Sequence, residues 1–365
     1  MTSFRSRRLE NDDEHELNLV YNRFTGRSRT GRLRSADEMH WLLHNAPGGP
    51  ADSWIIEAKE NTGWRIIGHH ALSPVRFTFG DEDWLCAKTM HTFLLPEFRD
   101  KFLYPRFERN CLRVADTRFD ATFSVGAGIA RMRSAFGYEN YGTWIQLERG
   151  FHPLHLIYRT ITNLVGRHSY PARVWLSQRL ASISAPPRQR KSIEFVEYTG
   201  AEAASSTFFA NFWKEARLGA GMAPRRDSAD LEWRFWKRPG FKGSTLTYTW
   251  PEGGHAYFIV DTLNPLLYSL ADFFLAPATA ARLEDLLDAL FVWCAQQGAL
   301  ALKFMTTPRG LPVQLSEVFH RNMKPFALQS FFLSMEFPRR ISPLGRIRTD
   351  GALPDWNATE FLNLG

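Results

Sequence analysis

Apolar residues near the N-terminus recur with the spacing of one helical face. In the stretch 14–24 these positions are Leu17, Val20, Tyr21 and Phe24, and the pattern ends at Thr25 and Gly26. A second helix is predicted to begin after Ser35, because its hydroxyl can cap the helix while Glu38 stands at the third helical position of a capping box. The segment 45–50, which is rich in proline and glycine, ends this helix.

Strand signals follow in close succession. Stretches rich in β-branched and aromatic residues are separated by turn residues at 61–63 and 80–81, and they predict an antiparallel meander. Its strands are expected at 53–58, 64–68, 75–79 and 84–95. A helix at 102–115, a strand at 121–125, a short helix at 129–136 and a strand pair between 138 and 147 complete this half. The mixture of the two periods indicates an α/β fold with a mixed sheet.

The second half of the chain repeats a similar order of elements. A helix at 205–218 and an aromatic segment at 231–236 precede strands at 244–250, 256–260 and 267–275, and then follow a helix at 278–297, a strand at 299–305, a helix at 311–319 and a strand at 326–337. We therefore predict an N-terminal domain at 1–150, a connecting helical segment and proline-rich linker at 151–190, a second domain at 191–340 and a tail at 341–365.

Composition and charge exclude several classes of protein. Of the 365 residues 44% are hydrophobic and 23% are charged, which excludes a disordered or low-complexity chain. The three cysteines lie far apart, so we expect no disulfide framework and a cytoplasmic protein. No apolar run reaches the roughly 18 residues that a membrane span needs. The net charge of +7 suits an anionic partner, but nucleic acid is not expected because none of its recognition motifs is present.

The most informative segment is Thr89–Tyr104, in which a predicted strand runs through Pro96-Glu-Phe-Arg99 into a helix. Together with the element order and Gly137-Tyr138, it resembles the GNAT superfamily of acyl-CoA N-acyltransferases over residues 9–149. In that family the loop after the strand opens a helix whose backbone N–H groups hold the cofactor pyrophosphate. The resemblance implies a cofactor site formed by Phe93, Leu94, Leu95, Arg99, Asp100, Lys101, Phe102, Leu103 and Tyr104.

The loop departs from the family pattern at two positions. Phe102 and Tyr104 stand where the family has glycines, which allow backbone to approach phosphate closely. Two interpretations remain open: both rings turn into the core and leave the helix N–H groups to the phosphates, or this half keeps the fold without the cofactor. The second half also resembles a GNAT domain, so the expected architecture is two GNAT-like domains in tandem.

Candidate residues for proton transfer come from the same resemblance. His91 is the titratable group on the strand before the loop and could be the base, or a structural histidine of the core. Arg133 stands at the position of the family's frequent tyrosine acid, so the candidates for the acid are Tyr138, Tyr141 and Tyr104. In the second half Asp272 lies in an apolar strand and is either catalytic or a hydrogen-bonded structural carboxylate. Arg234 could bind an anionic part of the substrate or pack against aromatic rings.

The function that the resemblance implies is N-acyl transfer. An amine of a small molecule, peptide or sugar attacks the thioester of acetyl-CoA or a longer acyl-CoA, with an acyl-carrier protein as a variant donor, and strand N–H groups polarise the carbonyl. The alternative is a catalytically inactive GNAT-like binding or scaffold protein. No metal is expected, because His69 and His70 are adjacent on a strand and face opposite sides, and no zinc motif is present.

Overall fold

The chain divides into two compact units. The computed structural model describes residues 3–26, 33–79, 82–101, 103–115, 118–126, 139–150, 193–217, 222–251, 253–262, 266–275, 283–306 and 331–336. Residues up to 142 and the segment 331–336 belong to the first unit, and described residues from 143 to 306 belong to the second.

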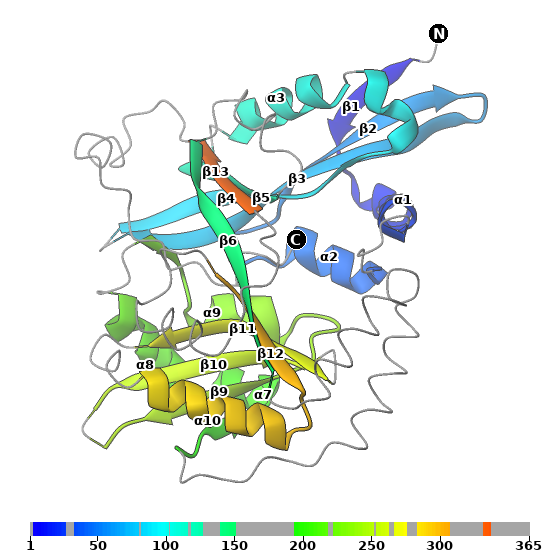
Figure 1. The fold of residues 1–365 in the computed structure, drawn as a ribbon. Helices are drawn as coiled ribbons and strands as arrows, with labels where there is room; N and C mark the ends of the chain where they lie inside the picture. Colours follow the sequence, from blue (N-terminus) through cyan, green and yellow to red (C-terminus); the bar gives the residue numbers. More distant parts are fainter. Residues whose placement is uncertain are drawn as a thin grey trace. The chain divides into compact units, whose positions relative to one another are not determined.

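The first unit is built on a mixed sheet. Its elements are β1 (Phe4–Arg8), η1 (Asn11–Asp13), α1 (Glu14–Gly26), α2 (Ala36–His44), β2 (Asp52–Glu60), β3 (Gly63–Phe79), β4 (Glu82–Leu94), η2 (Pro96–Lys101), α3 (Leu103–Ala115), β5 (Ala121–Gly126) and β13 (Phe331–Glu336) (Figure 1). The strands lie in the order β1-β2-β3-β4-β5-β13. The β4–β5 pair is parallel and the other pairs are antiparallel.

Helices cover both faces of this sheet. The side chain of Ser35 accepts a hydrogen bond from the Glu38 N–H, as the predicted cap requires, and α2 begins at the next residue. Figure 1 shows α2 and α3 on opposite sides of the strands. The core of the unit is formed by buried apolar residues of the central strands and of all three helices, among them Leu17, Leu43, Ile67, Phe93 and Phe107.

The prediction of two separate strands at 64–68 and 75–79 was wrong. The structure has one strand, β3, from Gly63 to Phe79. Residues 66–75 are buried without interruption, so both faces of the strand are covered. A strand that is buried on both faces does not alternate apolar and polar residues. The polar residues His69, His70 and Ser73 are buried in the middle of β3, but from the sequence alone they indicate a turn between two strands.

The second unit repeats this plan. Its elements are β6 (Glu139–Gly150), β7 (Val196–Tyr198), α7 (Gly200–Ser205), α8 (Thr207–Ala216), β8 (Met222–Pro224), α9 (Ser228–Leu231), η4 (Glu232–Trp236), β9 (Gly243–Thr249), β10 (His255–Asp261), β11 (Leu267–Leu275), α10 (Leu283–Gln296) and β12 (Ala301–Thr306). The strand order is β7-β9-β10-β11-β12-β6, and β11 and β12 are its parallel pair. Phe258, Leu290 and Phe304 lie in its core.

The last strand of each unit comes from the other half of the sequence. β6 follows β5 in the chain, yet its residues Ile145–Gly150 pair with β12 of the second unit. β13 follows β12, yet it pairs with β5 of the first unit. The domain boundaries at 150 and 191 stay predictions, because 151–192 lies outside the described residues, as do the predicted helices at 129–136 and 311–319. Within the described ranges, no helix is long and apolar enough to cross a membrane.

Candidate active site

The two parallel strands of the first unit part half-way along their length. Cys86, Ala87 and Lys88 of β4 pair with residues 121–123 of β5. Beyond this point β5 continues against β13, with Val125 opposite Leu333, whereas β4 continues to Leu94 against β3. The end of β4 is therefore an edge toward β5, and strand edges present backbone N–H and C=O groups.

A β-bulge lies in this part of β4. His69 pairs with Phe93 and Ala71 pairs with Met90, so His91 and Thr92 together stand opposite the single residue His70. His91 has a φ of 50°, which makes it the one residue other than glycine with positive φ among those that the structure describes. Such a backbone costs free energy and persists where its surroundings fix it.

Hydrogen bonds from His69 fix the bulge. Its Nδ1 lies 2.9 Å from the carbonyl oxygen of His91, and its Nε2 lies 2.6 Å from the Ser53 hydroxyl. Burial lowers the pKa of His69 to about 4, so the ring is neutral and carries one N–H. A carbonyl can only accept, so Nδ1 donates to His91 and Nε2 accepts from Ser53. Because the peptide is trans, the Thr92 N–H points away from His69.

The same burial makes stability depend on pH. In the unfolded chain His69 has an ordinary pKa of 6.5, so it takes up a proton below that pH, whereas the folded state does not do so until about pH 4. The contribution of neutral His69 to the free energy of unfolding is therefore complete above pH 6.5 and is lost as the pH falls toward 4. We expect the free energy of unfolding to drop by roughly 3 kcal/mol over this range. Urea unfolding of wild type and His69→Asn measures it, and an equally steep decline in the variant would contradict the assignment.

A short helical turn links the bulged strand to α3. The turn, η2, begins at Pro96, and α3 begins at Leu103, as the sequence predicted within one residue. Arg99 is exposed, and its Nε donates to the Leu94 carbonyl at 3.2 Å. The Tyr104 ring lies edge-on to His70 and Phe107, and its hydroxyl is 3.1 Å from His70 Nδ1. Tyr104 thus turns toward the sheet, as one of the two interpretations requires.

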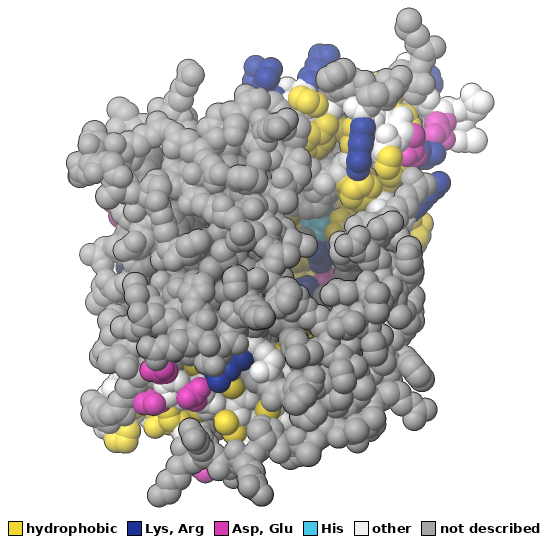
Figure 2. Space-filling view, viewed as in Figure 1, with side chains coloured by type: hydrophobic (Ala, Val, Ile, Leu, Met, Phe, Trp, Pro, Cys, Tyr) yellow, Lys and Arg dark blue, Asp and Glu magenta, His cyan; other side chains and the backbone are white. Residues whose placement is uncertain are grey.

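The N-terminal turn of α3 has the electrostatics of an anion site. The first N–H groups of a helix lack intrahelical partners and carry partial positive charge. Pro105 has no N–H, so this turn has one donor fewer than an ordinary helix start. Arg106, Arg109 and Arg113 are exposed on α3. Figure 2 shows Lys and Arg side chains at the upper edge of the view, where Figure 1 places α3.

Comparison with known proteins identifies the fold. No family model and no curated protein matches the sequence. A Saccharomyces cerevisiae N-myristoyltransferase, solved with myristoyl-CoA and inhibitors, matches with a TM-score of 0.60 and 13% identity over 93% of this chain and 81% of its own. A probable N-acyltransferase from Enterococcus faecalis V583 matches with 0.58 and 10%, over 92% and 73%. A GCN5-related N-acetyltransferase from Anabaena variabilis ATCC 29413 matches with 0.56 and 10%, over the same shares. The chain has a tandem GNAT fold.

The residues predicted to hold the cofactor occupy different environments in this GNAT fold. Phe93, Leu94 and Leu95 are buried, so their side chains belong to the core, and the Leu95 N–H donates to Ile67 at 2.9 Å. Asp100 and Lys101 lie in η2. Phe102 and Tyr138 lie outside the described residues. Backbone groups and exposed cations, rather than apolar side chains, are what this region offers a ligand.

The His91 ring is also buried. It is 6% exposed, and its centroid lies 5.1 Å from that of Tyr21 on α1, in an edge-on arrangement. The bulge around it is therefore packed from the α1 side. The His91 ring thus lies in the core of the first unit, while the backbone of the same residue shapes the edge of β4.

The second GNAT domain has an equivalent bulge whose surroundings are filled by protein. β11 pairs with β12 as far as Leu270, and a register shift leaves Ala271 as the extra residue before Asp272. Asp272 is fully buried and accepts from Arg226 Nε at 3.0 Å and from the Tyr257 hydroxyl at 2.6 Å. Although burial acts to lower the pKa of Arg226, the neighbouring carboxylate keeps it raised, and burial raises the pKa of Tyr257 well above its ordinary value.

Arg234 lies in the interior of the second unit. It is 3% exposed, and its guanidinium carbon lies 4.4 Å from the centre of the Trp233 ring. Burial lowers its pKa to about 9. Packing against an aromatic ring is one of the two interpretations of Arg234 that the sequence left open; the other is substrate binding.

Sequence reasoning missed the residues that organise both bulges. His69 was considered only as a metal ligand, and Arg226 and Tyr257 were not singled out. A polar side chain within a strand covered on both faces must find hydrogen-bond partners inside the protein. The adjacent His69 and His70 in such a strand therefore indicated buried hydrogen bonds. Arg226 carried none, because its partner lies 46 residues away in the sequence.

Proposed function

We propose that the chain is an N-acyltransferase that moves an acyl group from acyl-CoA to an amine. The observation that carries this proposal is the parted end of β4, where the bulge at His91 directs the Thr92 N–H away from His69 just before the turn into α3. The thioester carbonyl of the donor would accept from this N–H, and the diphosphate would lie at the start of α3.

The reaction needs few protein groups. The amine nitrogen forms a bond to the carbonyl carbon, the C–S bond breaks, and the proton lost by the amine balances the charge of the departing thiolate. An N–H already oriented toward the carbonyl oxygen stabilises the charge that develops on it. We assign His91 to the geometry of the bulge and not to proton transfer, because its ring packs against Tyr21. We assign Asp272 and Arg234 to the stability of the second unit.

The donor site is proposed for the first unit. The exposed Arg106, in the first turn of α3, suits the phosphates of CoA, and a longer acyl chain or an acyl-carrier protein is a variant of the donor. In the second unit the equivalent bulge is enclosed by Arg226, Asp272 and Tyr257.

A substitution at the start of α3 tests the donor site. Arg106 lies in the first turn, so Arg106→Glu places a negative charge beside the proposed diphosphate, and we expect the KM for acyl-CoA to rise about tenfold, which corresponds to about 1.4 kcal/mol. Release of CoA thiol from acetyl-, octanoyl- and myristoyl-CoA with a panel of amines measures it. Arg113→Glu, in the last turn of the same helix, is the matched control and should change KM less than twofold.

The assay also separates the proposal from its alternative. A catalytically inactive GNAT-like binding or scaffold protein would release no CoA thiol from any acyl-CoA, and would transfer no label from an acyl-carrier protein to any amine. That result would reject the enzyme. Activity with equal effects of Arg106→Glu and Arg113→Glu would keep the enzyme and reject the placement of the diphosphate.

A further inference from the structure

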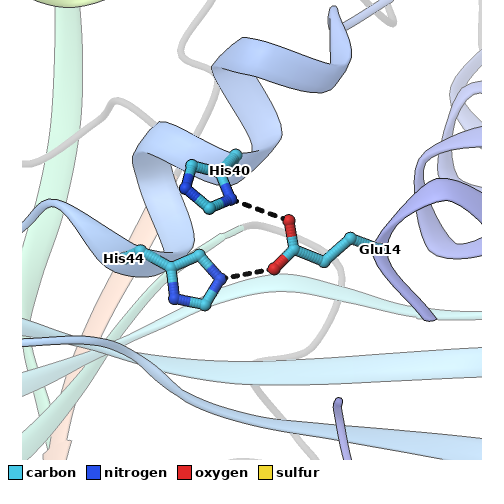
Figure 3. A group of neighbouring side chains, drawn as sticks. All are labelled: Glu14, His40 and His44. Carbon is cyan, nitrogen blue, oxygen red and sulfur yellow. Dashed lines mark hydrogen bonds and ion pairs between the residues drawn. The ribbon is translucent and has the colours of Figure 1, made fainter. Parts of the chain in front are cut away.

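Three potential metal ligands converge where α1 and α2 meet, outside the site described above. Glu14 is the first residue of α1, and His40 and His44 lie one turn apart on α2. His40 Nδ1 is 2.9 Å from one carboxylate oxygen of Glu14, and His44 Nε2 is 2.5 Å from the other (Figure 3). All three donor atoms lie within 4.8 Å of one another, and the two imidazoles point toward the same carboxylate.

The donor set selects a class of ion. Two imidazole nitrogens and one carboxylate oxygen suit borderline ions such as Zn²⁺, whereas Mg²⁺ and Ca²⁺ prefer all-oxygen sites. Histidines at i and i+4 lie on one face of a helix and can bind the same ion. In a tetrahedral zinc site with ligands at about 2.0–2.1 Å the donor atoms stand about 3.3 Å apart. The two nitrogen–oxygen distances, 2.9 and 2.5 Å, are shorter than this value, so side-chain rotations would move the donor atoms apart to admit an ion.

The backbone beneath the cluster is held in place while the ligands stay accessible. Leu17 of α1 and Met39, Leu42 and Leu43 of α2 are buried in one core, and the Ser35 cap fixes the start of α2. The side chains of His40, His44 and Glu14 are 61%, 33% and 18% exposed. The helices therefore supply a rigid base, and solvent can reach the ion as a fourth ligand.

We propose that Glu14, His40 and His44 bind one divalent transition ion of the zinc class. The ion would replace the two imidazole–carboxylate hydrogen bonds with metal–ligand bonds and would tie α1 to α2. The proposal is independent of acyl transfer, because it rests on residues that the proposed reaction does not use.

Titration calorimetry of the tag-free full chain with ZnCl₂ tests the site. We expect one Zn²⁺ per chain at these ligands and none with MgCl₂. The double variant His40→Ala, His44→Ala should weaken this binding by about 100-fold or more, since loss of even an outer partner of a metal ligand costs 10–100-fold. Zn²⁺ should also raise the melting temperature of the wild type and not that of the double variant. Co²⁺ should give the visible absorption of a tetrahedral site in the wild type alone.

His15→Ala is the matched control, because His15 is exposed on α1 beside Glu14 but lies outside the cluster. It should bind Zn²⁺ as the wild type does. Equal melting temperatures of all three proteins without metal would show that the variants fold. Zn²⁺ binding that survives both histidine substitutions would place the ion elsewhere and overturn the proposal, as would a wild type that binds no Zn²⁺ at millimolar concentration.

Discussion

Asp272→Asn is expected to lower the free energy of unfolding by about 3–5 kcal/mol, because it removes the charge that balances a fully buried guanidinium. Arg226 and Asp272 are both inaccessible to solvent and share three hydrogen bonds, with the Tyr257 hydroxyl as a further donor to the carboxylate. The neutral amide keeps the shape of the carboxylate but leaves the cation without its counter-charge. Urea unfolding followed by tryptophan fluorescence measures the loss.

Two further variants define the origin of this effect. Glu232→Gln breaks an ion pair with Lys237 on the surface of the same unit and should cost less than about 1 kcal/mol. The double replacement Arg226→Met, Asp272→Leu removes both charges and should recover most of the stability. An Asp272→Asn protein within about 1 kcal/mol of wild type would contradict the assignment of this pair to structure.

His69→Leu is expected to lower kcat/KM for acyl transfer by about 10²-fold, provided that the proposed function holds. The substitution removes the Nδ1–H that holds the His91 carbonyl, so the neighbouring Thr92 N–H loses its fixed direction. Displacement of a group by about 1 Å can cost this much in rate. The CoA-release assay measures the change.

His69→Asn serves as the conservative comparison. The asparagine side-chain N–H₂ can reach the place of Nδ1–H, so we expect it to retain kcat/KM within about tenfold of wild type. His69 is in this account a positioning residue, since it acts through the backbone of β4. If both variants lost activity equally while remaining folded, a general structural role would replace the proposed one.

Most of the fold could be predicted from the sequence. Periodicity placed α1, α2 and α3 and the strands of the meander, because one face of each is apolar and capping or turn residues mark their ends. It failed at β3, where burial is complete, and at 138–147, where the single strand β6 stands in place of the expected pair. The strand exchange of β6 and β13 could not be predicted, since local pattern carries no information about distant partners.

Only part of the candidate site could be predicted from the sequence. The Pro96–Arg99 motif indicated the segment between β4 and α3, but the register shift beside His91 has no local signal, because a bulge depends on how two strands pair. The buried Arg226–Asp272 pair likewise arises from residues far apart in the chain. The convergence of Glu14 with His40 and His44 depends on how α1 packs on α2.

The exchange of terminal strands has a consequence for biosynthesis. The first unit receives its final strand from residues 331–336, so its sheet stays incomplete until these residues have emerged from the ribosome. Until then β5 is an open edge, which in a nascent chain invites pairing with other molecules. A gene divided between β12 and β13 would therefore encode a first unit that lacks its closing strand.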